Sequence, residues 1–228
     1  MTPRQVAHGR DAAAPVTAKA HHASKPRRRT IRASRVEGAA GAIGLVEPGC
    51  EVFILTHGQF SLIDAIVYLS QQIGPCRLSV STWTAGTEDL QAMANLLAAG
   101  QFTGCRWLVD RSFLTRQPAY CARLRELFGD DVIRTTRSHA KFVTLRNASF
   151  DLAVRTSMNL NHNPRLEDIE ISDDPALADF LDAEFDTYFH QQPPGQLNAE
   201  MIENRAAASG IRAGRASAGR IYPQGARP

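Results

Sequence analysis

Glu51-Val-Phe-Ile-Leu-Thr56 opens the part of the chain that decides the fold. Its continuous apolar run is typical of a buried strand, and the Ser61-Leu-Ile-Asp64 that follows has the spacing of a capping box for a helix ending near Ile73. The same order recurs twice, as a strand at 77–83 with a helix at 88–99, and a strand at 105–110 with a helix at 118–128. Three such units predict parallel strands covered by helices.

The pattern changes after Gly129. Four strand-like segments follow, at 132–137, 141–146, 150–157 and 166–171, and Asn147-Ala-Ser149 has the composition of a hairpin turn. Asp174-Pro175 then starts an amphipathic helix over 176–189. We therefore expect one α/β domain over 45–190, built on a mixed, mostly parallel sheet flanked by helices.

The net charge of +3 conceals an uneven distribution of charge. Residues 1–36 carry nine basic side chains and one acid, whereas residues 37–190 carry 12 basic and 20 acidic ones. The stretch Lys25-Pro-Arg-Arg-Arg29 and the Gly- and Arg-rich end of the chain have little that could form a core. We expect disordered basic tails at 1–44 and 191–228. They suit attraction to DNA or RNA, or a solubilising or targeting role.

Several protein classes are excluded by composition. No apolar stretch approaches the roughly 20 residues of a membrane-spanning helix, so membrane insertion is not expected. The N-terminus lacks the apolar block of a secretory signal, which favours a cytoplasmic protein. The four cysteines are widely spaced and form no CxxC pair, so we expect reduced thiols rather than a disulfide framework or a zinc site. Trp83 and Trp107 fall in predicted strands and are expected in the core.

Five residues with complementary chemistry follow the third helix. His139 and Lys141 are two apart on a predicted strand and therefore share a face, as do Ser157 and Asn159 on the return strand. A nucleophilic imidazole, a fixed positive charge and neutral hydrogen-bond donors are what a phosphodiester site needs. Glu167 is the candidate for orienting the imidazole.

Basic residues surround this set. Residues 132–166 hold six basic side chains and one acid, and we expect Arg155 and Arg165 to bind substrate. The alternative is that these arginines are merely solvated, which we favour for Arg146 at the turn. His57 follows the first strand, at the end where open α/β sheets bind ligands, and is a further substrate-binding candidate with capping or packing as the alternative. The glycines of 38–44 match neither of the two phosphate-loop spacings, GxGxxG and GxxxxGK, so we expect a flexible linker there.

Together these residues resemble the signature of the phospholipase D superfamily: His-x-Lys, a hairpin, then Gly/Ser-Ser-x-Asn and a downstream Glu. The resemblance covers about 51–189. It implies that His139, Lys141, Ser157, Asn159 and Glu167 are catalytic. Arg146 stands where the family has an Asp, five residues after the Lys; in addition, Thr156 replaces a common Gly and the hairpin is slightly longer.

The resemblance also implies a mechanism and an assembly. Members of this superfamily use two copies of the motif and this chain has one, so an active form requires a homodimer with both His139 residues at one phosphate. Hydrolysis then proceeds through a phosphohistidine, with no metal and no cofactor. Size and layout are similar to the nuclease-like branch, and the style of the chain suggests a bacteriophage or prophage origin. The alternatives are an inactive nucleic-acid-binding or regulatory protein and, third, a phospholipase.

Overall fold

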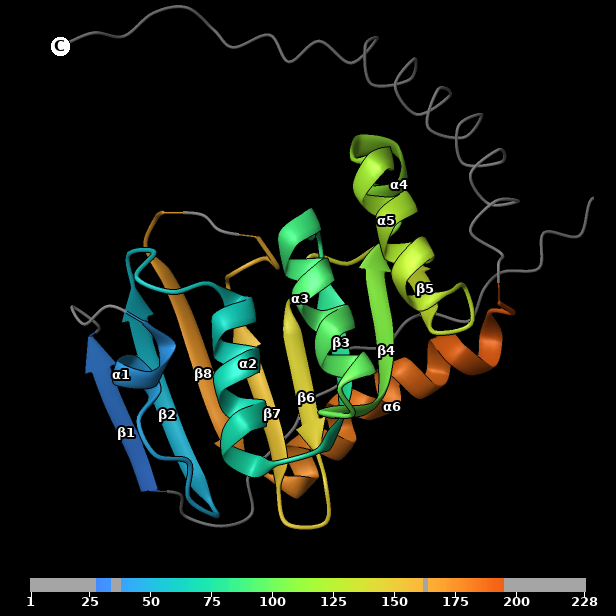
Figure 1. The fold of residues 1–228 in the computed structure, drawn as a ribbon. Helices are drawn as coiled ribbons and strands as arrows, with labels where there is room; N and C mark the ends of the chain where they lie inside the picture. Colours follow the sequence, from blue (N-terminus) through green and yellow to red (C-terminus); the bar gives the residue numbers. More distant parts are fainter. Residues whose placement is uncertain (1–27, 34–37, 162–163, 195–228) are drawn as a thin grey trace, which may run out of the picture.

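The computed structural model describes residues 28–33, 38–161 and 164–194 (Figure 1). The helices and strands alternate through most of this part of the chain. In order they are β1 (Arg28–Ala33), α1 (Ala39–Ile43), β2 (Cys50–Thr56), α2 (Leu62–Ile73), β3 (Cys76–Thr82), α3 (Thr87–Ala98), β4 (Phe102–Asp110), α4 (Phe113–Arg116), α5 (Pro118–Phe128), β5 (Ile133–Thr136), β6 (Phe142–Arg146), β7 (Asp151–Thr156), β8 (Glu167–Asp173) and α6 (Pro175–Gln191).

The described strands form one sheet in the order β1-β2-β8-β7-β6-β3-β4-β5. The pairs β1–β2, β3–β4 and β4–β5 are parallel, and the other four pairs are antiparallel. The expected α/β domain with a mixed sheet flanked by helices is confirmed, but the expectation of mostly parallel pairing is wrong. The reason is that β6, β7 and β8 are inserted between β2 and β3, and strand order of this kind is not visible in a linear sequence.

Helices cover the two faces of the sheet unequally. Figure 1 shows α1, α2, α3 and α5 on one face and α6 on the other. The larger core packs the first group of helices against residues such as Ile54, Val80 and Trp107, whereas α6 packs through Leu181 and Phe185 on Phe142. The position of Trp107 in the core is as predicted from the sequence.

Local signals in the sequence form as expected. The Ser61 backbone N–H donates to Asp64 Oδ2 over 2.8 Å while the Asp64 N–H donates to Ser61 Oγ over 3.3 Å, which completes the capping box of α2. At the β6–β7 hairpin, Asn147 Oδ1 accepts the N–H groups of Ser149 and Phe150, both over 2.9 Å. The side chain of Asn147 thus fixes the turn.

Two elements lie inside the span expected to be a tail. β1 pairs in parallel with β2, and the residues expected to be a linker form α1, where Ala39, Ala42 and Ile43 are buried. An edge strand needs a backbone partner on one side only, so a charged sequence can form one. Small side chains let the short helix α1 lie close to α2. Residues 1–27, 34–37 and 195–228 of the expected tails lie outside the described residues.

The four cysteines are free. Burial raises the pKa of Cys76, Cys105 and Cys121 to about 11. These thiols are therefore protonated, and poor nucleophiles, at neutral pH. None of the helices in the described ranges is both long and apolar enough to span a bilayer.

Candidate active site

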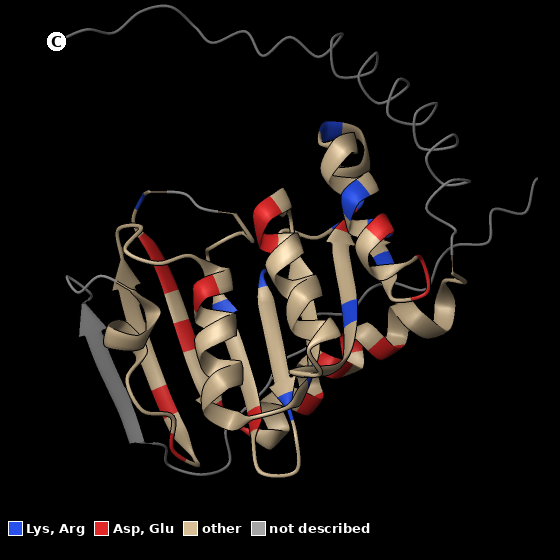
Figure 2. Cartoon of the chain, viewed as in Figure 1, with Lys and Arg blue, Asp and Glu red and all other residues tan. Residues whose placement is uncertain are grey.

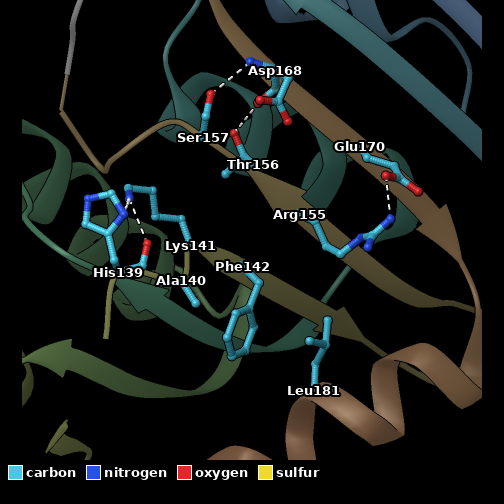
Figure 3. A pocket seen from close by; sticks show the side chains of 10 residues that line it. All are labelled: His139, Ala140, Lys141, Phe142, Arg155, Thr156, Ser157, Asp168, Glu170 and Leu181. Carbon is cyan, nitrogen blue, oxygen red and sulfur yellow. Dashed lines mark hydrogen bonds and ion pairs between the residues drawn. The ribbon is translucent and has the colours of Figure 1, made fainter. Parts of the chain in front are cut away.

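A pocket of about 520 Å³ lies where β6 begins and β7 ends, bordered by β8 and α6 (Figure 3). His139 and Lys141 line it from the segment that leads into β6, and Ser157 lines it from the residue after β7. The sequence predicted His139 and Lys141 to lie on the strand itself, but β6 begins only at Phe142. The histidine is consequently carried by a loop, where its side chain is exposed.

Lys141 is buried and points at His139. Its Nζ donates to the carbonyl oxygen of His139 over 2.8 Å and lies 3.3 Å from His139 Nδ1. Burial lowers the pKa of Lys141; Glu167 partly opposes this shift, and Arg165 adds to it. The site therefore presents an ammonium group in contact with an imidazole at the wall of an open pocket.

Ser157 is held in place by the first two residues of β8, Glu167 and Asp168. Its hydroxyl donates to Glu167 Oε2 and accepts the N–H of Asp168 over 2.9 Å. Glu167 also pairs with Arg165 over 3.2 Å. No hydrogen bond joins Glu167 to His139 within the described residues, so the expected orientation of the imidazole by this carboxylate is not seen.

The two arginines expected to bind substrate have carboxylate partners. Arg155 lines the pocket and pairs with Glu170 over 2.5 Å, while Arg165 pairs with Glu167. Figure 2 shows acidic residues along β8 and α6. The positive field expected from residues 132–166 is thus partly neutralised, because β8 comes from later in the sequence and pairs with β7.

Asn159 and His57 do not line this pocket. Asn159 is buried beside the segment that follows β3, where Leu160 bridges to Ala85, and its Oδ1 has no hydrogen-bond partner in the described structure. His57 is exposed after β2, and its backbone N–H donates to Gln59 Oε1 over 2.6 Å. The structure therefore brings together His139, Lys141, Ser157 and Glu167 from the predicted set.

The chain resembles several solved structures. One of them is described as a member of the phospholipase D family. Nuc of that family, from Salmonella typhimurium, is 16% identical with a TM-score of 0.43 over 62% of this chain and 95% of Nuc. NucT from Helicobacter pylori is 11% identical with a TM-score of 0.44 over 63% of this chain and 99% of NucT. Phosphatidylserine synthase from Haemophilus influenzae is 18% identical with a TM-score of 0.40 over 71% of this chain and 46% of the synthase. No family model and no curated protein matches the sequence.

Two residues close to the loop that carries His139 were not predicted from the sequence. Trp83 was expected in the core, yet it is half-buried after β3 with its ring centroid 5.6 Å from that of His139. Asp110, at the end of β4, accepts the N–H of Ser138 next to His139 over 2.9 Å. The signal that could have found both is their position at the carboxyl ends of parallel strands, where open α/β sheets bind ligands.

Arg146 does not behave as the solvated residue expected at the turn. Its guanidinium pairs with Asp151 over 2.5 Å, with Asp179 over 2.7 Å and with Asp182 over 3.2 Å. The last two residues belong to α6, which the sequence could not place over β6. Arg146 therefore ties α6 to the hairpin, away from the residues that line the pocket.

Proposed function

We propose that this chain is a phospholipase D-like phosphodiesterase, acting as a metal-independent nuclease through a phosphohistidine intermediate in a homodimer. The observation that carries the proposal is the contact between the Lys141 ammonium and His139 Nδ1 at the wall of an open pocket. An imidazole supplies the nucleophile and an adjacent cation stabilises the charge that develops on a phosphoryl group.

The Lys141 ammonium can donate either to His139 Nδ1 or to a phosphate of the substrate. The structure places Lys141 Nζ 3.3 Å from His139 Nδ1, and an imidazole that accepts a hydrogen bond at Nδ1 carries its proton on Nε2. A phosphate entering the pocket offers the ammonium a stronger, charged acceptor. Once Lys141 turns to the phosphate, the proton can reside on Nδ1 and the lone pair of Nε2 is available for attack.

The chemistry then requires two histidines. Nε2 of one His139 forms a bond to phosphorus as the bond to the leaving oxygen breaks, and a second imidazole donates a proton to that oxygen. Water next attacks the phosphorus, gives a proton to the second imidazole and releases the first. Because the sequence has one copy of the motif, the second imidazole is His139 of another chain related by a two-fold axis.

Ser157 lines the pocket and is proposed as the neutral donor of this site, which requires its hydroxyl to turn from Glu167 to the phosphate. Arg155 and Arg165 are the residues proposed to bind flanking substrate, with Asn159 and His57 as further proposed contacts made on substrate binding. The basic sequence at 1–36 supports a nucleic acid as the substrate. We propose a cytoplasmic location for this activity, in keeping with the four free cysteines.

One observation favours the second candidate, an inactive nucleic-acid-binding or regulatory protein. Glu167 is engaged by Ser157 and Arg165, so no carboxylate orients His139 in the described structure. An imidazole without such a partner is a weaker nucleophile. The two candidates differ in turnover and not in binding, which makes them separable.

The test compares the wild type, His139→Asn and the control His190→Asn, which changes an exposed histidine near the end of α6. Plasmid, single-stranded DNA, RNA and a phosphodiester reporter are incubated with each protein in EDTA. We expect cleavage by the wild type and the control, and a loss of at least about 100-fold in His139→Asn. Salt-sensitive binding without cleavage by any of the three would favour the binding protein, and activity abolished by EDTA would refute the metal-independent mechanism.

A mixing experiment tests the dimer. If each active site needs two His139 residues, an excess of His139→Asn allowed to exchange subunits with the wild type abolishes the wild-type activity. Sedimentation should show a dimer at micromolar concentration. A wild type that remains monomeric, or whose activity is unaffected by the mutant, would contradict the shared site.

A further inference from the structure

Trp83 and Arg116 form a stacked pair beside His139. The Arg116 guanidinium carbon lies 3.5 Å from the centroid of the Trp83 ring. The same ring lies against the imidazole, with centroids 5.6 Å apart and planes tilted by 59°. Two short contacts through one indole therefore connect the cation of Arg116 with the proposed nucleophile.

Arg116 is exposed but held in one orientation. Its Nε donates to Ser112 Oγ over 2.9 Å and its Nη2 donates to the Trp83 carbonyl oxygen over 3.2 Å. The Ser112 hydroxyl in turn donates to Asp110, the carboxylate that also accepts the Ser138 N–H. The contacts thus form a closed ring that begins and ends at the loop carrying His139.

The guanidinium keeps unused donor capacity. It has five N–H groups, and two of them take part in the hydrogen bonds just described. Within the described residues no carboxylate pairs with Arg116, in contrast to Arg146 and Arg155, which both have acidic partners. A cation that is fixed in position and lacks an acidic partner has the properties of an anion-binding group, because little conformational entropy is lost when the anion binds.

We propose that Arg116, stacked on Trp83, binds the phosphate next to the one that is cleaved at His139. This inference rests on the proposed function and adds to it a substrate class, a strand that carries at least two phosphates in succession. The unused N–H groups of Arg116 bind the second phosphate, while the indole between Arg116 and the imidazole of His139 fixes their separation. A substrate with a single phosphodiester and no neighbouring phosphate lacks this contact.

The experiment uses the full chain and dinucleotides that differ by one phosphate. A dinucleoside with one internal phosphodiester is compared with the same molecule phosphorylated at its 5′ or its 3′ end. In the wild type we expect kcat/KM to be about tenfold higher for one of the phosphorylated forms, as for a charge-assisted hydrogen bond. In Arg116→Gln this preference should disappear. In the control Arg123→Gln, which removes the same charge from a residue paired with Glu126 on α5, it should persist.

Binding separates a failure of this inference from a failure of the proposed function. If the wild type cleaves neither dinucleotide, the affinity for a labelled single-stranded oligonucleotide is measured against salt concentration. Arg116→Gln should then lower the slope of log K against log salt by about 0.7, and Arg123→Gln and Arg116→Lys should not. Equal preference in the wild type and Arg116→Gln would overturn the inference, as would equal salt slopes or the absence of binding by the wild type.

Discussion

Asp182 joins α6 to the sheet through a buried carboxylate, and Asp182→Asn tests how much the fold depends on it. The residue is 4% exposed. Its Oδ1 accepts hydrogen bonds from the hydroxyls of Thr144 over 2.8 Å and Ser79 over 3.2 Å. Arg77 lies 2.8 Å and Arg106 3.0 Å from the same carboxylate, and Arg146 is a third cationic partner.

The loss of stability in Asp182→Asn depends on which carboxylate partners the arginines retain. Removing one member of a buried ion pair costs about 3–5 kcal/mol, because it leaves an uncompensated charge. Arg106 retains Asp186, and Arg146 retains Asp151 and Asp179, so we take the lower end, about 3 kcal/mol. For a domain of this size that loss lowers Tm by roughly 6–12 °C.

Urea unfolding measures this loss. The unfolding midpoint should fall while the m-value stays constant, since the surface exposed on unfolding is unchanged. Asp179→Asn is the matched control because its side chain is 69% exposed although it also pairs with Arg146. It should cost less than about 1 kcal/mol. If the two variants have equal stability, the buried network does not hold α6 in the way described here.

Three further outcomes follow from the charges of the structure. Arg146→Asp restores the residue typical of the phospholipase D signature, yet it should destabilise the domain more than Arg146→Gln in the same urea assay, because a fourth carboxylate joins Asp151, Asp179 and Asp182. Burial acts to raise the pKa of Asp182, but the hydrogen bond from Thr144 and the charges of the arginines outweigh burial and lower it. The stability that this carboxylate contributes is therefore present above pH 3.8 and is lost as the pH falls through the lower pKa of the folded state. Unfolding measured against pH should show this loss in the wild type and not in Asp182→Asn. The pKa of Lys141 is lowered from its usual 10.5, so the ammonium group should lose its proton, and activity should decline, at a pH below 10.5. In Lys141→Arg this decline should be absent from the pH–rate profile.

Local features could be predicted well from the sequence because they depend on neighbouring residues. The capping box of Ser61 and Asp64 and the turn at Asn147 involve groups at most three residues apart. The side chains of His139 and Lys141 are also close together, although both residues precede β6 instead of lying on the predicted strand.

Features that depend on strand order could not be predicted. The partners of Arg146 on α6 and those of Arg155 on β8 come from segments 15 to 36 residues further along the chain. The stacking of Trp83 on Arg116 needs the loop after β3 and the end of α4 to meet, and no local pattern encodes that meeting. The strand β1 was missed because its arginines suggested a solvated tail, whereas its pairing with β2 depends on backbone groups.

The insertion of β6, β7 and β8 between β2 and β3 has a consequence for synthesis on the ribosome. When residues up to Thr136 have emerged, β1–β2 and β3–β4–β5 can each pair in parallel, but β2 and β3 are not neighbours and each leaves an open edge. Both edges close only when the last three strands have been made, and the pairing of Thr56 with Glu167 spans more than a hundred residues. Late closure of this kind slows folding and leaves nascent chains prone to association through their edges. Nascent chains that end before β8 should therefore depend on chaperones for solubility.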